Sequence, residues 1–141
     1  MQIIIKLIFL SLFGILVSNA QQSTPNEITV IVSNLNSNKG KVFVALYNSE
    51  SNFLKKQIKG NISDIDNNSC TVTFKDIPNG IYAISLFHDV NSNNKMDTNF
   101  LGIPKEDYGC SNNAKGFMGP PKWKDAKFQI NNKSIIQQIK L

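Results

Sequence analysis

Apolar and polar residues alternate with a period of two over much of the chain, which is the pattern of strands that bury one face. The alternation predicts six strands, near residues 28–32, 42–46, 71–74, 81–87, 126–130 and 134–141. Turn-forming residues such as Gly40, Gly80 and Asn132 separate neighbouring strands. Short strands with little helix between them favour an all-β fold, an antiparallel β-sandwich of about seven strands.

Two shorter segments lack this alternation. Phe53, Leu54 and Ile58 have helix-like spacing, so residues 49–58 are a candidate for one short helix that covers an end of the core. Residues 60–69 are polar and rich in Asn and Asp, so they are expected to form a loop.

Residues 89–125 make up the longest stretch without alternation. Structureless loops beyond about 12–15 residues are uncommon in compact domains. The stretch nevertheless contains Trp123 and several other large apolar side chains, which disordered segments generally lack. We therefore expect one long, ordered loop at 89–125.

The N-terminus has the three parts of a signal peptide: Lys6, the apolar run 7–17 and a small-x-small site at 18–20. The alternative is a transmembrane helix, which needs about 18 or more apolar residues without a charge, and Lys6 interrupts this run. We predict that residues 1–20 are removed and that residues 21–141 form a single domain. The protein is then periplasmic or extracellular, with no transmembrane anchor after cleavage.

Charge and cysteine content change this picture little. The formal net charge is +5, but the lysines are scattered among acids and asparagines and form no basic stripe with aromatic residues. Nucleic acid is therefore not expected as a partner. The two cysteines, Cys70 and Cys110, either form a disulfide after export or remain buried thiols, and their spacing does not fit a zinc site.

The long loop opens with the sequence DVNSNNKMD at residues 89–97. Oxygen-bearing side chains stand at positions 1, 3, 5 and 9, as in the first part of an EF-hand calcium loop, where alternate side chains turn inward around the ion. The expected ligands are the side chains of Asp89, Asn91, Asn93 and Asp97 and the backbone carbonyl of Lys95.

Two departures weaken this motif. Asn94 takes the place of the usual glycine, although asparagine tolerates the left-handed conformation better than most residues. Phe100 stands where an EF-hand has its closing glutamate, so Glu106 or Asp107 is expected to supply a remote ligand. The motif thus predicts weak calcium binding, with a dissociation constant of about 10⁻⁴–10⁻³ M. The alternative is an asparagine-rich turn without an ion.

Catalysis is not favoured by the residues available. His88 is the only histidine, and without a second ligand or an assigned nucleophile it completes neither a zinc site nor a triad. It shares a strand face with apolar residues, so we expect a hydrogen-bonded histidine at the edge of the core.

Four segments form a combined signature. They read FKDIPNGIYA at 74–83, HDVNSNNKMD at 88–97, GIPKEDYGCSNNA at 102–114 and GPPKWKDAKF at 119–128. Together they resemble the uncharacterised, secreted bacterial family called domain of unknown function 2141. The chain departs from that family at Asn94, where glycine is common, and at Cys110, where an aromatic residue is common. The first segment is also similar to transthyretin-like sandwiches, which implies two sheets of the Ig-like or prealbumin type. No activity is implied.

These patterns favour a secreted binding or structural module that presents a calcium-ordered loop to a protein, glycan or surface partner. Tyr108, Phe117 and Trp123 are the candidate contact residues. The alternatives are a hydrolase that uses loop carboxylates, which needs convergent acids in a pocket, and a carrier of a small apolar ligand, which needs a cavity.

The exported protein is expected to begin at Gln21, because cleavage follows the small-x-small site. The intact mass of the protein recovered outside the cytoplasm measures this directly. A mass that still includes Met1–Ala20 would contradict the prediction.

Overall fold

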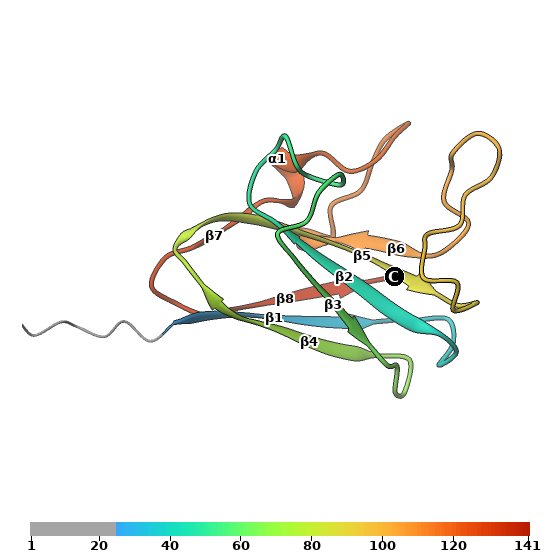
Figure 1. The fold of residues 1–141 in the computed structure, drawn as a ribbon, viewed down its shortest axis with the longest axis horizontal. Coiled ribbons are helices and arrows are strands. Elements are labelled where there is room, and N and C mark those ends of the chain that lie inside the picture. The colour runs from blue at the N-terminus through green and yellow to red at the C-terminus, as the bar shows by residue number, and fades with distance from the viewer. Residues whose placement is uncertain (1–24) are drawn as a thin grey trace, which may run out of the picture.

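The computed structural model describes residues 25–141, which form two layers of strands (Figure 1). The strands are β1 (Asn26–Ser33), β2 (Lys41–Tyr47), β3 (Lys59–Ser63), β4 (Cys70–Ile77), β5 (Gly80–Asp89), β6 (Tyr108–Cys110), β7 (Phe128–Ile130) and β8 (Ile135–Lys140). The two helical segments are a 3₁₀ turn, η1 (Ser111–Asn113), and a single α-helical turn, α1 (Trp123–Ala126). None of the helices within 25–141 could span a membrane. The predicted leader lies outside these residues.

The strands form two sheets that pack face to face. One sheet has the order β4-β1-β8, and the other has the order β3-β2-β5-β6 with β7 also paired to β5. β2 occupies one edge of β5, while β6 and β7 share the other edge. The predicted all-β sandwich is confirmed, with eight strands in residues 25–141 instead of about seven. β1 and β8 run parallel, because the chain crosses from the second sheet at β7 to the first at β8.

The expectation of a loop at 60–69 was wrong over its first half, where β3 pairs with β2. β3 is an edge strand whose first four residues are exposed on both faces. A strand without a buried face has no reason to alternate apolar and polar residues, so its sequence lacks the usual signal.

The helix expected at 49–58 is also absent, and turns take its place. Two separate helical hydrogen bonds form, from the Phe53 N–H to the Ser49 carbonyl at 3.1 Å and from the Lys56 N–H to the Asn52 carbonyl at 2.9 Å. Leu54 then adopts a positive φ of 59°, which a right-handed helix cannot continue. The one α-helical turn in the described chain is α1, inside the segment predicted to be a long ordered loop.

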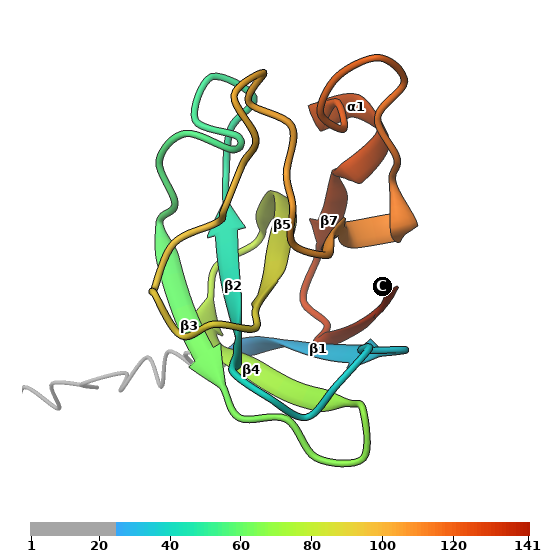
Figure 2. The same cartoon turned by 90° about the vertical axis from the view of Figure 1, so that its right-hand side faces the viewer.

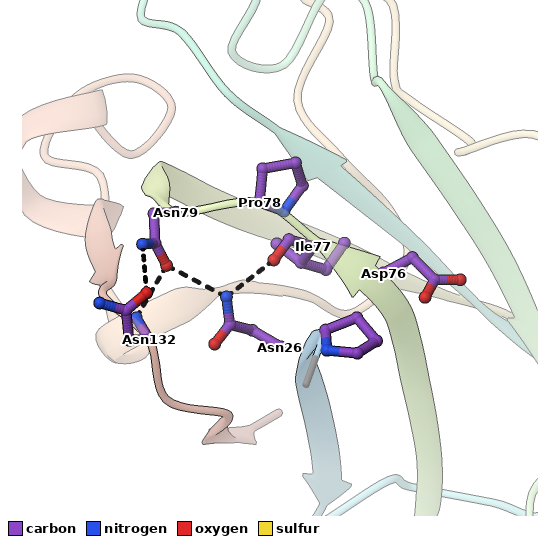
Figure 3. Close-up of a pocket in the computed structure, with 7 residues that line it drawn as sticks. Asn26, Asp76, Ile77, Pro78, Asn79 and Asn132 are labelled. Atoms are coloured by element: carbon purple, nitrogen blue, oxygen red, sulfur yellow. Dashed lines mark hydrogen bonds between the residues drawn. The ribbon is translucent and has the colours of Figure 1, made fainter. Parts of the chain in front are cut away.

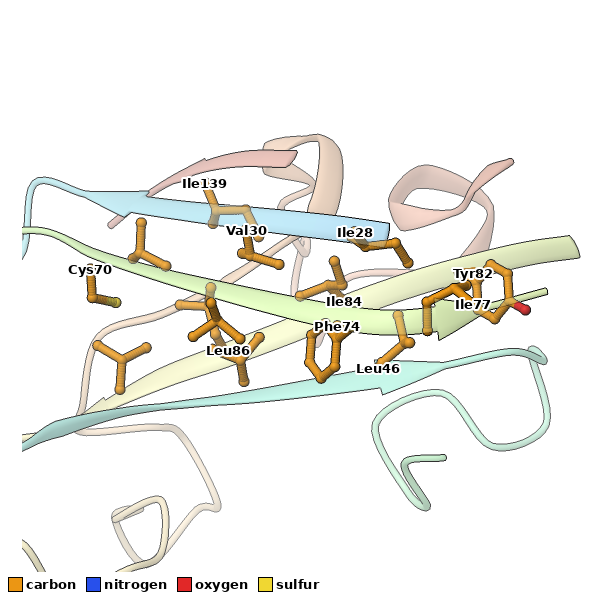
Figure 4. Close-up of a cluster of buried hydrophobic side chains, with 14 of the residues drawn as sticks. Ile28, Val30, Leu46, Cys70, Phe74, Ile77, Tyr82, Ile84, Leu86 and Ile139 are labelled. Atoms are coloured by element: carbon orange, nitrogen blue, oxygen red, sulfur yellow. The ribbon is translucent and has the colours of Figure 1, made fainter. Parts of the chain in front are cut away.

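The core lies between the sheets and is built from the alternate residues that each strand turns inward (Figure 4). On β5 these residues are Tyr82, Ile84 and Leu86, and Ile84 stands opposite Leu46 of β2. Both members of this pair are fully buried. Burial of such a side chain contributes about 1.5–3 kcal/mol, so this layer supplies most of the apolar stabilisation.

A second apolar cluster covers the outer face of the five-stranded sheet. Phe53 packs edge-on against Tyr47 at 5.4 Å between ring centroids and against Trp123 of α1 at 5.7 Å. Ala83 of β5 and Ala126 of α1 complete the contact. This cluster fixes the turns at 48–58 and the end of the long loop on the same face of the sheet.

Of the two alternatives for the cysteines, the structure has the buried free thiols. Cys70 belongs to the core between the sheets, whereas Cys110 belongs to the cluster on the outer face of the five-stranded sheet. That sheet separates the two sulfur atoms, so the disulfide considered from the sequence does not form.

Both thiols are expected to be unreactive until the protein unfolds. Burial raises the pKa of Cys110 to about 12 and also raises the pKa of Cys70, so little thiolate is present near pH 8. Without any reductant, a colorimetric thiol reagent should react slowly with the folded protein. In urea, where the protein is unfolded, the same reagent should react rapidly with both cysteines. A denatured, unreduced sample without free thiols would contradict this.

Candidate calcium site

Asp89 is the last residue of β5 and anchors the start of the candidate loop. Strand alternation turns its side chain to the outer face of the five-stranded sheet, where the following residues cover it completely. Its two carboxylate oxygens accept hydrogen bonds from the backbone N–H groups of Asn93 at 3.2 Å and Asn94 at 2.8 Å. Each oxygen retains a further lone pair, so the carboxylate can still bind a cation.

The other predicted side chains gather around Asp97. Its two oxygens accept hydrogen bonds from the side-chain amides of Asn91 at 2.6 Å and Asn93 at 2.8 Å. The amide oxygens of these asparagines each accept a backbone N–H, from Asn93 and Lys95 respectively. Hydrogen bonds therefore link the side chains of Asn91, Asn93 and Asp97 within the loop.

Of the two remote acids, Glu106 reaches this cluster and Asp107 does not. The carboxylate of Glu106 accepts hydrogen bonds from the backbone N–H groups of Val90 at 3.2 Å and Asp97 at 3.1 Å. The carboxylate of Asp107 instead accepts a hydrogen bond from the Asn36 side chain. Glu106 is thus the better remote ligand.

Asn94 has the left-handed conformation that its position requires, with a φ of 63°. Its N–H group is one of the two donors to Asp89. Asparagine therefore performs the backbone role of the glycine in this kind of loop, at a modest conformational cost.

His88 is fully buried beside Asp89, as a hydrogen-bonded residue at the edge of the core. Its Nε2 lies 2.7 Å from the Lys39 carbonyl oxygen, and its Nδ1 has no hydrogen-bond partner among the described residues. Gly40 follows with a φ of 73°, and a Cβ there would come within 1.8 Å of the Asp89 carbonyl oxygen. The 36–40 turn therefore packs directly on the base of the loop.

The carboxylate of Asp89 forms no ion pair within residues 25–141, although Lys41 of β2 is its cross-strand partner. Within residues 25–141 the one ion pair joins Lys41 to Asp64, at 3.2 Å. In the same range, no three His, Cys, Asp or Glu side chains are grouped so as to hold a metal. A cation at this site would therefore need the amide oxygens of Asn91 and Asn93 as ligands in addition to the carboxylates.

Two surface hollows elsewhere in the described chain have volumes of about 240 and 260 Å³. In the first, the Asn26 side chain donates to the Ile77 carbonyl at 3.0 Å and to the side-chain oxygen of Asn79 at 3.1 Å (Figure 3). Asn79 in turn donates to Asn132 at 2.7 Å. These amide hydrogen bonds link β1, the turn before β5 and the turn before β8, so the network closes this end of the sandwich.

The three candidate contact aromatics differ in exposure. Trp123 is half-buried against Phe53, Tyr108 is 43% exposed and Phe117 is 90% exposed. Trp123 therefore serves mainly to hold α1 on the sheet, while Tyr108 and Phe117 remain accessible.

The family model described as "Uncharacterized protein conserved in bacteria (DUF2141)" matches residues 30–138. The chain belongs to this family. The matched range contains most of the core of both sheets and the whole candidate calcium loop. No curated protein and no solved structure matches the chain, so the transthyretin-like arrangement stays a prediction.

In this DUF2141 chain the loop hydrogen bonds should control the titration of Asp97. Its pKa is lowered by the hydrogen bond from Asn93 first and Asn91 second, with small contributions from Lys95 and Lys105. Because the pKa of Asp97 is lower in the folded protein than in the unfolded chain, its ionised carboxylate stabilises the folded state. This stabilisation is complete above the unfolded pKa, near 3.8, and is lost as the pH falls through the folded pKa.

Asn93→Ala should therefore move the pKa of Asp97 up toward 3.8, as measured by NMR titration of the carboxyl carbon. The matched control is Asn131→Ala, an exposed asparagine in the turn before β8, which should leave this pKa unchanged. An Asp97 pKa that is equal in all three proteins would show that the loop bonds do not form in solution.

Proposed function

We propose that this protein is an exported β-sandwich module whose loop at 89–107 is ordered by one calcium ion and presents apolar side chains to a partner. The observation that carries the proposal is the fully buried carboxylate of Asp89, which forms no ion pair within residues 25–141 because its cross-strand partner Lys41 pairs with Asp64 instead. A buried charge is costly unless it is paired or bound to a metal, and the two N–H donors offset only part of that cost.

The charge balance of the loop supports the same conclusion. Residues 89–107 carry four acids against two lysines, Lys95 and Lys105. Three of the acids, Asp89, Asp97 and Glu106, are linked through shared backbone and side-chain hydrogen bonds. One divalent cation would neutralise the excess charge and replace the amide donors at Asp97. Carboxylate, amide and carbonyl oxygens are the ligands that calcium prefers.

The loop has few apolar contacts that could order it without an ion. Phe100, Leu101 and Ile103 are all exposed and lie outside both apolar clusters. Hydrogen bonds to carboxylates supply its main internal links. Exposure of these residues also favours a binding role over a covering role, since a segment that only covered the core would bury its apolar side chains.

The hydrolase and carrier alternatives have less support. The acids of the loop accept hydrogen bonds from backbone and side-chain amides, and none of them lines either described hollow. Those hollows are smaller than the roughly 300–1,000 Å³ of typical small-molecule sites.

Calcium should raise the melting temperature by several degrees, with EDTA as the reference. At a calcium concentration about 100 times the dissociation constant, linkage stabilises the folded state by about 2.7 kcal/mol, which is large enough for such a shift in a domain of this size. Magnesium should give a smaller shift, because it requires tight octahedral geometry and releases its waters reluctantly.

Asp89→Asn and Asp97→Asn keep the side-chain shape and remove one charge each, so each should abolish most of the calcium shift. Asp125→Asn is the control, because this acid is exposed in α1 and lies outside the loop. The proposal fails if calcium leaves the wild type unchanged, or if both loop variants keep the full shift.

A further inference from the structure

Two of the loops carry large apolar side chains at their tips. In the 90–107 loop, Thr98 and Pro104 form an isolated antiparallel bridge, and the Asn99 N–H donates to the Ile103 carbonyl at 2.9 Å. The enclosed tip contains Phe100, which is 95% exposed, and Leu101, which is 67% exposed. The tip of this loop is therefore apolar and exposed to solvent.

The second tip belongs to the 114–122 loop. Gly116 lies so close to Gly119 that a Cβ on Gly116 would come within 1.7 Å of the Gly119 carbonyl oxygen. Phe117 and Met118 are the two central residues of this tight turn, and they are 90% and 95% exposed. The buried Pro121 follows and stiffens the stem of the turn.

Met118 is an unfavourable choice for the turn itself. Its φ is 53°, a conformation that favours Gly or Asn and strains other residues. A fully exposed methionine contributes no packing in exchange. The sequence thus accepts both backbone strain and exposed apolar area at this point, which indicates selection for a contact outside the chain.

Both tips rise on the same side of the molecule, above the outer face of the five-stranded sheet (Figures 1 and 2). The turns at 48–58 reach the same side and include the exposed Leu54. The three-stranded sheet faces away from them. One side of the protein therefore presents several separate apolar projections.

The charges beside the 114–122 tip and beside Leu54 are mainly positive, with Asp125 and Glu50 as the acids nearest in sequence. The 114–122 loop contains Lys115 and Lys122 and no acid, and Lys124 follows in α1. Lys55 and Lys56 directly follow Leu54. All five lysines are exposed. Projecting apolar side chains with lysines around them match a bilayer with anionic headgroups, where the side chains enter the interface and the lysines meet the lipid charges.

We propose that this side of the protein is a peripheral membrane-binding surface for anionic bilayers, with Phe117 and Met118 as its principal inserted residues. This proposal rests on the proposed function and deepens it, because it names an anionic bilayer as the partner of the loops. A protein partner fits less well, because protein interfaces are closely complementary and would need matching pockets for several separated projections. A fluid interface accepts them without such pockets.

Calcium connects the two loops in this account. Without the ion, the 89–107 loop has a net negative charge, from four acids and two lysines, and anionic lipid repels it. With the ion bound, its formal charge becomes neutral, and Phe100 and Leu101 can approach the surface. Binding through the basic 114–122 loop does not need calcium, whereas the contribution of the 89–107 loop does.

The test is co-sedimentation with phosphatidylcholine vesicles, with and without phosphatidylglycerol. The wild type should bind the mixed vesicles, bind pure phosphatidylcholine weakly, and lose affinity in salt. Phe117→Ser combined with Met118→Gly should weaken binding at least tenfold, because two apolar side chains are removed. The glycine suits the positive φ, so the melting temperature should not fall.

Ile136→Ser is the matched control. Ile136 is 63% exposed on β8, in the sheet that faces away from the loops, so this variant should bind like the wild type. All proteins share the same N-terminus, so the leader cannot produce a difference between them. The inference is overturned if the wild type ignores anionic vesicles, if the double variant binds equally well, or if the double change removes only self-association.

Repeating the assay in EDTA separates this inference from the calcium proposal. Vesicle binding that depends on Phe117 and Met118, in a protein whose melting temperature ignores calcium, would retain the membrane surface and reject the ion. If calcium raises the melting temperature but the protein binds no vesicles, the calcium proposal is retained and the membrane surface is rejected.

Discussion

The alternation of side chains along β5 places both the core and the two loops that cover the outer face of the five-stranded sheet. Tyr82, Ile84 and Leu86 face inward and form the centre of the core, so the intervening residues must face outward. Ala83 thereby lies under the aromatic cluster, and Asp89 lies under the candidate calcium loop. One strand with a period of two thus builds the core on one face and supports two functional loops on the other.

The two loops are held by different kinds of interaction. The end of the long segment is fixed by the apolar contact of Trp123 with Phe53, which needs no ion and is insensitive to salt. The start of the segment is fixed by hydrogen bonds to Asp89, Asp97 and Glu106. Polar links of this kind respond to pH and to cations. The apolar contact therefore holds the 114–122 tip independently of pH and cations, whereas the hydrogen bonds that hold the 89–107 loop depend on both.

Much of the fold follows from the sequence, because most strands have one buried face. β1, β2, β4 and β5 were predicted from their alternation, and the left-handed Asn94 followed from the position of glycine in calcium loops. The pattern fails where its physical cause is missing. β3 is exposed on both faces, and the spacing of Phe53, Leu54 and Ile58 reflects turns packed on a sheet. Local sequence does not encode these tertiary contacts.

The candidate site was predictable in its local part only. The spacing of Asp89, Asn91, Asn93 and Asp97 brings these residues together because they share one loop. The choice between Glu106 and Asp107 depends on Asn36, which lies about 70 residues earlier and captures Asp107. The fate of the cysteines likewise depends on which sheet faces each thiol. Neither relation leaves a signal in the neighbouring sequence.

The central claim is that a cation completes the network around the buried carboxylate of Asp89. Amide hydrogen exchange by NMR tests it at the residues concerned. Saturating calcium should slow exchange of the N–H groups of Val90, Asn93, Asn94 and Asp97, which donate to the loop carboxylates. The core amide of Ile84 should exchange as before. Equal exchange rates at these loop amides in calcium and in EDTA would contradict the claim.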